Sequence, residues 1–383
     1  MHTPRLLSRC LFVAFLLSFV SGAVLPARSP AARPECHDFD WTLHISASND
    51  FGFAVPAATY NISATYCPPL KAVANRSQTV QLLIHGATGN KLYWSALASP
   101  DEQGYQTYNY SWTEFARLEG YHTLAIDRLG CGNSSHPDPA LVRTTPEVEI
   151  VAQLLEILHS KSPRQASHSF LPSFSSVILT GFSFGSLVID VLLNKPPSPS
   201  SIPLINATIL TGYSHIPNSH PNPNVTISTQ QFLPGSQVFP VRFKSLDPGY
   251  KTIATATNYA HSFFAGAYDP IVPNVIWSSE DVQASGEVNS LAAGASSFNI
   301  SSVATYRAPT AIVAGEFDEP LCGGNCGSGD TDLLAMSKRY YPGVEEEEYF
   351  SLRVPNTGHM LHYHESARGT MEAVHDWLAR MGF

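Results

Sequence analysis

One serine in this sequence lies between two glycines with a spacing that suits a nucleophile. The motif Gly181-Phe182-Ser183-Phe184-Gly185 follows an apolar run at 176–180 and leads into an apolar-periodic run at 187–193. This context predicts a strand, a sharp turn and a helix, with Ser183 on the turn. The turn strains the backbone of the nucleophile and leaves no room for bulky neighbours, which explains a glycine two residues to either side. The helix amino terminus would favour negative charge that develops beside the serine hydroxyl.

This motif and its context resemble the serine α/β-hydrolase family, and further motifs follow in that family's order of nucleophile, acid and histidine. The resemblance covers nearly all of the chain after position 34. It implies that Asp318, which follows an apolar strand at 310–314, is the acid, with Glu316 and Glu319 as competitors. It also implies that His359, on the loop before the last helix, is the base. His359 would remove the serine proton, and the acid would hold the imidazole in the right tautomer.

A second loop is similar to the family's oxyanion loop. The segment His85-Gly86-Ala87-Thr88-Gly89 follows an apolar strand at 81–84. By that resemblance, Ala87 and Phe184 each supply a backbone N–H to the oxyanion. His85 is expected to orient this loop rather than to act as a second base. The segment 127–134 resembles the family's turn after the next strand, whose role is chiefly architectural.

The elements that must position these residues follow an alternating pattern of buried strands and helices. Alternation of this kind predicts an α/β fold with a mostly parallel central sheet flanked by helices, which is the α/β-hydrolase fold that the resemblance implies. Strands are expected at 79–84, 123–126, 177–180, 207–211, 310–314 and 349–354. Helices are expected at 112–119, 146–161, 184–194 and 371–381. Two edge strands are expected near the amino terminus, at 41–46 and 57–66.

Between about 214 and 308 the alternation breaks into a segment rich in Pro, Asn, Ser and aromatic residues. We interpret it as a cap inserted between sheet strands rather than as an independent domain. The expected organisation is a signal peptide at 1–23, the first part of the hydrolase core at 24–213, the cap at 214–308 and the second part of the core at 309–383. The cap aromatics would either line an apolar pocket over the site or fill the core of the cap.

The first residues are typical of a secretory signal, because Arg5 and Arg9 precede an apolar run at 11–20 and small residues at 21–23. A retained anchor is the alternative, but the run is short against the ~20 residues that a spanning helix needs. No later segment could cross a membrane, so no stable membrane insertion is expected after cleavage. Asn-x-Ser/Thr sequons suit a glycosylating secretory pathway and an extracellular location. They start at Asn61, Asn75, Asn109, Asn133, Asn206, Asn224 and Asn299.

The formal net charge of the chain is -9, and no basic stretch suits phosphate groups. Nucleic acid is therefore a poor candidate partner. The expected partner is a small-molecule ester or lactone, with no cofactor and no metal. The oligomeric state stays open.

The cysteines suit an oxidising compartment. Cys10 leaves with the signal, so at least one of the five remaining thiols stays unpaired or bridges chains. Cys322 and Cys326 flank a flexible spacer that would let a tight disulfide close a loop, and Cys36 with Cys67 would tie the amino-terminal strands together. A zinc site is the alternative for the close pair, although no second Cys/His pair with ligand spacing lies nearby.

The expected activity is hydrolysis of a carboxylic ester or lactone through an acyl-enzyme that water resolves. A serine in the elbow argues against the epoxide hydrolase and haloalkane dehalogenase branches, which carry Asp there. The alternatives are lyase, cyclase or transferase chemistry with the same triad, and a catalytically silent ligand-binding relative. The chain also resembles secreted α/β-hydrolases of filamentous fungi, some of which belong to secondary-metabolite pathways. A secondary metabolite is therefore a possible substrate by analogy.

Overall fold

The computed structural model describes residues 35–98, 104–159, 168–216, 231–294, 303 and 305–383. These residues belong to a unit that spans Pro34–Phe383. The expected signal peptide at 1–23 lies outside the described residues, as do the sequons at Asn224 and Asn299.

The centre of this unit is an eight-stranded sheet with the order β1-β4-β6-β5-β7-β8-β12-β13. Six neighbouring strands, from β6 to β13, run parallel, while β4 pairs antiparallel with both β1 and β6. The strands are β1 (His37–Ile45), β4 (Ala58–Cys67), β5 (Thr79–Ile84), β6 (His122–Ile126), β7 (Ser176–Phe182), β8 (Ala207–Thr211), β12 (Thr310–Gly315) and β13 (Tyr349–Val354). The predicted mostly parallel sheet is therefore confirmed.

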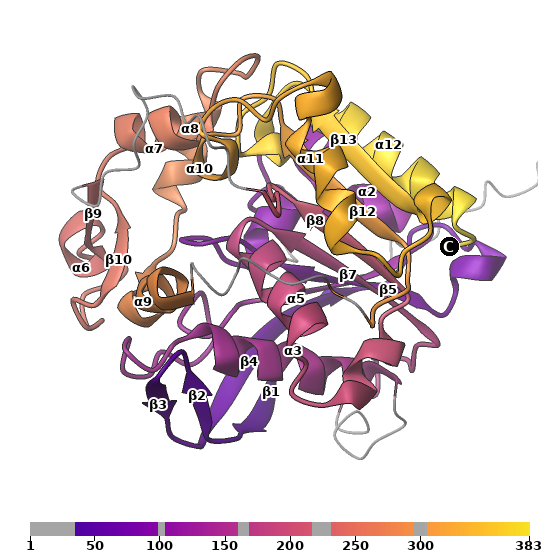
Figure 1. Cartoon of the computed structure of the whole chain (residues 1–383). Coiled ribbons are helices and arrows are strands. Elements are labelled where there is room, and N and C mark those ends of the chain that lie inside the picture. The colour runs from indigo at the N-terminus through magenta and orange to yellow at the C-terminus, as the bar shows by residue number, and fades with distance from the viewer. Residues whose placement is uncertain (1–34, 99–103, 160–167, 217–230, 295–302, 304) are drawn as a thin grey trace, which may run out of the picture. The chain divides into compact units, whose positions relative to one another are not determined.

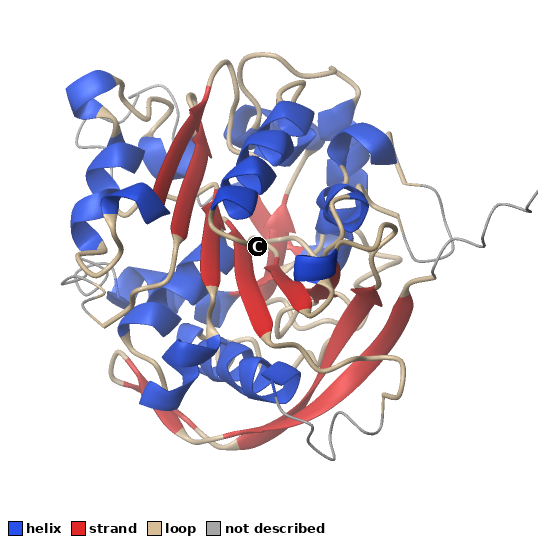
Figure 2. Ribbon diagram, turned by 90° about the vertical axis from the view of Figure 1, so that its right-hand side faces the viewer, coloured by secondary structure: helices blue, strands red, loops and turns tan. Residues whose placement is uncertain are grey.

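Helices cover both faces of the sheet, because the parallel strands are apolar on both sides. Alternate side chains of one strand point to opposite faces. In β5, Leu82 packs in one core cluster with helices α3 (Thr144–His159) and α5 (Phe184–Asn194). Leu83 packs in the other with α2 (Trp112–Leu118) and α12 (Ala367–Arg380). Figure 1 shows α3 and α5 side by side, and Figure 2 shows helices on both sides of the twisted sheet.

The chain between β8 and β12 forms a smaller set of elements that lie together at the left of Figure 1. A three-stranded antiparallel sheet has the order β11-β10-β9. The elements are β9 (Phe232–Pro234), α6 (Gly235–Val238), β10 (Tyr250–Ile253), α7 (Ala256–Phe263), α8 (Val272–Ser278), β11 (Gln283–Ala284) and α9 (Ser285–Gly294). This insertion corresponds to the segment interpreted as a cap, and we call it the cap below. The domain limits expected from the sequence stay a prediction.

The remaining short elements lie in connections of the chain. They are the hairpin β2 (Ser48–Asp50) and β3 (Phe53–Val55), and the helices α1 (Thr107–Tyr110), α10 (Glu319–Cys322) and α11 (Leu333–Met336). None of the helices in the described ranges combines the length and the apolar character that crossing a bilayer requires.

Two element boundaries differ from the sequence prediction for reasons of packing. Helix α12 begins at Ala367 rather than 371, because Ala367 and Thr370 are buried and their contacts outweigh the low helix propensity of Gly369. Strand β1 begins at His37 rather than 41, since it pairs with β4 along its whole length, from His37 opposite Tyr66 to Ile45 opposite Ala58.

The expected cysteine pairs form disulfides, Cys36 with Cys67 and Cys322 with Cys326. The first bond ties the start of β1 to the end of β4. The second closes the loop after α10, so these two thiols are bonded to each other rather than arranged around a zinc ion. Cys131 is a buried free thiol, and burial raises its pKa well above the usual range.

Candidate active site

Ser183 occupies the turn between β7 and α5 in a backbone conformation that residues other than glycine rarely adopt. Its φ is 52° and its ψ is -118°. The flanking glycines are required by close backbone approaches. A Cβ on Gly181 would lie 2.6 Å from the amide nitrogen of Ser186, and a Cβ on Gly185 would lie 2.1 Å from the carbonyl oxygen of Ile84. The motif therefore packs the turn directly against the end of β5 and holds the serine hydroxyl at the edge of the sheet.

The structure brings Ser183, His359 and Asp318 together in one hydrogen-bonded chain. Ser183 Oγ lies 2.9 Å from His359 Nε2, and His359 Nδ1 lies 2.8 Å from Asp318 Oδ2. Asp318 follows β12 and is fully buried, and His359 follows β13 and is almost fully buried. These distances suit a nucleophile, a general base and an acid that orients the base.

Neither competing acid hydrogen-bonds His359. Glu316 accepts hydrogen bonds from Arg353 Nη1 at 2.6 Å and from the backbone N–H of Asn356 at 2.8 Å, and these bonds lower its pKa. Burial, together with the like charge of Asp318, raises the pKa of Glu319 to about 7. Asp318 also caps α10, because its Oδ1 accepts the backbone N–H of Leu321. The geometry thus favours Asp318 over both glutamates.

His85 holds the predicted oxyanion loop in place. Its Nδ1 donates to the carbonyl oxygen of Gly86 at 2.7 Å, and its Nε2 accepts the backbone N–H of Arg128 at 3.0 Å. Burial and the nearby Arg128 charge keep the pKa of His85 well below its usual range, so the ring is neutral. A neutral ring with both nitrogens engaged orients this loop and is not free to act as a base.

Ala87 and Phe184 lie in the wall of the same cavity as Ser183. Phe184 is the first residue of α5, where a backbone N–H has no partner within the helix. Over the part of the chain that the structure describes, neither of these two N–H groups donates to a protein acceptor. Two such donors beside a nucleophile can bind a developing oxyanion.

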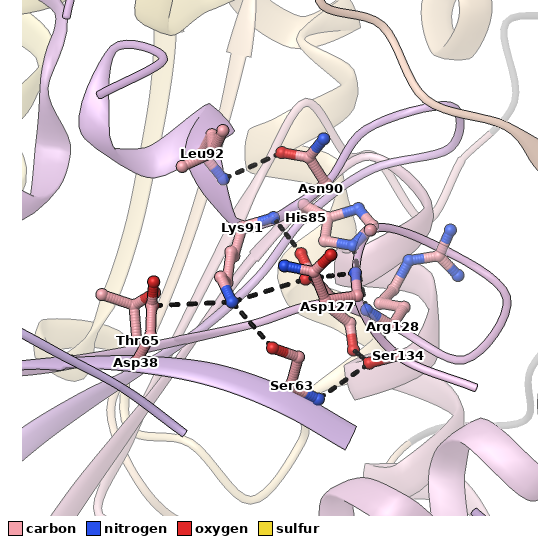
Figure 3. Close-up of polar contacts among 12 residues, drawn as sticks. Asp38, Ser63, Thr65, His85, Asn90, Lys91, Leu92, Asp127, Arg128 and Ser134 are labelled. Carbon is pink, nitrogen blue, oxygen red and sulfur yellow. Dashed lines mark hydrogen bonds and ion pairs between the residues drawn. The ribbon is translucent and has the colours of Figure 1, made fainter. Parts of the chain in front are cut away.

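The turn after β6 forms a polar network with the segment that follows the predicted oxyanion loop, as Figure 3 shows. Asp127 Oδ1 accepts the backbone N–H of Lys91 at 2.7 Å, and Asp127 Oδ2 lies 3.6 Å from Lys91 Nζ. Lys91 Nζ also donates to Ser63 Oγ at 2.8 Å. These bonds join β4 and β6 to the segment after the oxyanion loop, in agreement with an architectural role for this turn.

Arg128, in the same turn, connects the site to the cap. Its Nη1 donates to the carboxylates of Glu147 on α3 and Glu287 on α9, and its guanidinium lies 4.5 Å from the centre of the Phe184 ring. All three charged side chains are buried. Burial raises the pKa of the Glu147 carboxyl, and the charge of Arg128 opposes that shift. The sequence analysis singled out neither Glu147 nor Glu287, since nothing in the chain marks that Arg128 and Glu287, 159 positions apart, meet.

A cavity of about 810 Å³ opens at Ser183 and His359. Its apolar wall includes residues of the core and of the cap: Tyr93, Leu97, Phe182, Leu187, Phe232, Tyr259, Phe263, Ile276 and Leu291. Among the described residues, no lysine or arginine lines it. Both expectations for the cap aromatics apply, because Phe232, Tyr259 and Phe263 line the cavity whereas Phe243 and Tyr250 pack in the core.

A histidine and a carboxylic acid of this cavity were missed by the sequence analysis. His215 follows β8, and its Nδ1 lies 3.5 Å from Asp190 Oδ1 on α5. Glu280 comes from the cap segment between α8 and β11. No motif surrounds either residue. The sequence feature that could have pointed to Glu280 is an acidic residue within the aromatic-rich insertion.

Comparisons with known proteins identify the family to which this fold belongs. Residues 81–373 match the family model described as the alpha/beta hydrolase family. The chain is similar to a thermophilic esterase from Thermogutta terrifontis, with 16% identity, a TM-score of 0.51, and 89% of this chain and 99% of that one covered. It is also similar to a monoglyceride lipase from Saccharomyces cerevisiae, with 13% identity, a TM-score of 0.52, and 93% and 98% covered. No curated protein matches. The family model spans most of the chain, which therefore belongs to the alpha/beta hydrolase family.

Proposed function

We propose that this hydrolase cleaves a carboxylic ester or lactone, with Ser183 as nucleophile, His359 as general base and Asp318 as the acid that orients the base. The observation that carries the proposal is the hydrogen-bonded chain from Ser183 Oγ through the imidazole to the buried carboxylate. The two similar structures are an esterase and a lipase, and both activities belong to the same reaction class.

In the proposed reaction, His359 Nε2 takes the proton of Ser183 Oγ as the oxygen attacks the carbonyl carbon. The N–H groups of Ala87 and Phe184 stabilise the negative charge on the carbonyl oxygen. The tetrahedral intermediate collapses with cleavage of the C–O bond, and the imidazolium returns its proton to the leaving alkoxide. Water then attacks the acyl-enzyme with His359 as base, which releases the carboxylic acid and restores Ser183. In a lactone the two products stay joined as one hydroxy acid.

The cavity favours a neutral and largely apolar substrate. Its volume of about 810 Å³ suits a small or medium-sized organic molecule. Aromatic and aliphatic side chains form much of the wall, and among the described lining residues there is no cationic partner for a carboxylate or phosphate. A secondary metabolite with an ester or lactone group fits this description.

We also propose that the protein is secreted after cleavage of a signal peptide at 1–23. Two disulfides suit an oxidising compartment. The sequons at Asn61, Asn75, Asn109 and Asn133 are exposed, so they are accessible to glycosylation.

The test is labelling with a fluorophosphonate probe, combined with hydrolysis of p-nitrophenyl butyrate. Wild-type protein should be labelled at Ser183, and Ser183→Ala should lose the label and at least about 10³-fold in kcat/KM. Ser200→Ala, which changes an exposed serine in a short 3₁₀ helix, is the matched control and should behave as wild type. An unchanged rate in Ser183→Ala would refute the proposal. Product mass separates the reaction types, because hydrolysis adds one water whereas lyase, cyclase or transferase chemistry does not.

A further inference from the structure

Arg128 contacts both segments that would form the oxyanion hole. Its Nη2 donates to the carbonyl oxygen of Gly86 at 3.4 Å, and its guanidinium carbon lies 4.5 Å from the centre of the Phe184 ring. The two segments meet beside the nucleophile, since a Cβ added to Gly86 would lie 3.0 Å from Ser183 Cβ. One buried side chain is therefore shared by the two segments that carry the proposed donors.

The carbonyl oxygen of Gly86 and the N–H of Ala87 belong to one peptide group. No peptide bond in the described ranges is cis, and the C=O and N–H of a trans peptide point in opposite directions. The carbonyl oxygen accepts a hydrogen bond from His85 Nδ1 at 2.7 Å as well as one from Arg128 Nη2. The N–H of Ala87 therefore points away from both side chains, and Ala87 lines the cavity together with Ser183. A carbonyl that accepts two hydrogen bonds is also polarised, which strengthens the N–H of the same peptide as a donor.

Arg128 is held in this position by both the core and the cap. Its Nη1 donates to Glu147 on α3 at 2.6 Å and to Glu287 on α9 at 2.5 Å, and its backbone N–H donates to His85 Nε2 at 3.0 Å. None of the three charged side chains is more than 3% exposed. The carboxylate of Glu287 is fixed in turn, because its Oε2 accepts the backbone N–H of Ala284 at 2.8 Å. A guanidinium with this many fixed contacts can hold a neighbouring peptide in one orientation.

The contacts of Arg128 depend on the shape of the arginine side chain. Its planar guanidinium offers several N–H donors at fixed angles, and it stacks on aromatic rings. A lysine ammonium can pair with the same carboxylates, but it cannot also reach Gly86 and cover the Phe184 ring. Arginine and lysine thus differ here in their contacts with the oxyanion hole and not in their charge.

We propose that Arg128 is a positioning residue of the oxyanion hole. Its guanidinium holds the peptide between Gly86 and Ala87 and the start of α5, so that the two N–H groups point at the oxygen on which negative charge develops. This inference rests on the proposed function of Ser183 and extends it to the residues that orient the donors. Arg128 touches no reacting atom. Its effect is expected on the charged transition state rather than on the binding of a neutral substrate.

The test compares Arg128→Lys with wild-type protein in the hydrolysis of p-nitrophenyl butyrate and in the inhibition by an alkyl trifluoromethyl ketone. Ser183 Oγ adds to the ketone carbon, its proton moves to His359 Nε2, and the carbonyl oxygen becomes an oxyanion in the hole. We expect kcat to fall at least about tenfold while KM stays within about twofold, because the loss concerns the transition state. The inhibition constant of the ketone should rise by about the same factor. Rates are taken per serine labelled by fluorophosphonate at the end point, so unfolded protein does not count.

Arg143→Lys is the matched control, because Arg143 is another buried arginine with the same kinds of contact. Its Nε donates to the buried Asp50 at 2.9 Å, and its guanidinium lies 4.3 Å from the centre of the Phe53 ring. Neither Asp50 nor Phe53 lines the cavity at Ser183. Both lysine variants should lose stability in urea unfolding, but only Arg128→Lys should lose kcat and affinity for the ketone.

A second variant keeps the test decisive if Arg128→Lys does not fold. It combines Arg128→Met with Glu147→Leu and Glu287→Leu, so that no buried charge is left without a partner. Replacing a buried ion cluster by apolar side chains of similar size is often neutral or stabilising. The triple variant should therefore fold, and it should lose kcat and ketone affinity as Arg128→Lys does.

Several results would overturn the inference. They are wild-type kcat and ketone affinity in either Arg128 variant, a rise in KM that accounts for the whole loss of kcat/KM, and an equal loss of kcat in Arg143→Lys. If neither Arg128 variant folds, the side chain serves folding and the inference falls as well. A failure of the proposed function looks different, because wild-type protein would then neither take the fluorophosphonate label nor hydrolyse the ester.

Discussion

At the scale of single residues, the candidate site depends on which carboxylate meets His359. Three acids lie within four positions, Glu316, Asp318 and Glu319, and each has a different environment. Glu316 is tied to Arg353 and Asn356, and Glu319 has no hydrogen bond to the imidazole within the described structure. Asp318 alone of these acids has its carboxylate 2.8 Å from His359 Nδ1. The chemistry of the residue type did not separate them, but the direction of each side chain does.

Asp318→Asn should lower kcat on p-nitrophenyl butyrate by about 10³- to 10⁴-fold, because an amide in this place favours the wrong tautomer of His359. The rate should be measured by steady-state kinetics on protein with a wild-type circular dichroism spectrum. Glu316→Gln and Glu319→Gln make the same chemical change at the neighbouring acids, and their kcat should stay within about tenfold of wild type. A loss in either glutamate variant as large as that in Asp318→Asn would show that the acid was assigned to the wrong residue.

At the scale of elements, the site is made by strand ends that meet. The turn between β7 and α5 packs against the end of β5, and the loops after β12 and β13 bring Asp318 and His359 to it. The carboxyl ends of parallel strands share one edge of the sheet, which places these loops together. The cap is attached to the same edge through Arg128 with Glu287, and through Asp281 with the carbonyl oxygen of Thr88.

Gly185→Ala should disrupt the packing of the turn between β7 and α5 against the end of β5. The added Cβ would lie 2.1 Å from the carbonyl oxygen of Ile84, so β5 or the start of α5 must move. We expect a loss of stability of more than about 3 kcal/mol together with loss of fluorophosphonate labelling. Gly369→Ala is the matched control, because an added Cβ in α12 meets nothing within 4 Å. It should stabilise the protein by about 0.5–1 kcal/mol. Urea unfolding measures both variants, and a Gly185→Ala protein with wild-type stability and labelling would contradict the packing described here.

At the scale of the whole molecule, several titratable groups are buried in apolar surroundings. His362 lies among the rings of Tyr93, Trp94 and Trp112, and neither of its nitrogens has a hydrogen-bond partner among the described residues. Burial lowers the pKa of His362 to about 3, and that of His375 to about 4. Both rings are therefore neutral in the folded protein at neutral pH.

Stability should fall as the pH drops from about 6.5, the pKa of an unfolded histidine, towards 4. In this window the unfolded chain binds protons at these histidines that the folded chain does not, so the free energy of unfolding decreases with decreasing pH. His362→Phe should make this slope shallower. Between neutral pH and pH 5, the variant should lose about 1–2 kcal/mol less of its free energy of unfolding than the wild type loses. Urea unfolding at several pH values tests this. His261→Phe, at an exposed position of α7, is the control. The idea fails if the two variants have the same slope.

The local patterns of the chain were enough to predict the alternating elements, the turn at Ser183 and the order of the motifs. Short-range steric rules act within a few residues: glycines permit the strained turn, and apolar periods of two and 3.6 residues distinguish strands from helices. Packing between distant segments decided the rest. It selected Asp318 from three acids, brought Glu287 to Arg128, buried Glu280 in the cavity and divided the cap aromatics between cavity and core. The physical reason is that burial and side-chain direction depend on neighbours that are distant in the chain, such as Ser183 and His359, 176 positions apart, and no local pattern contains such a pair.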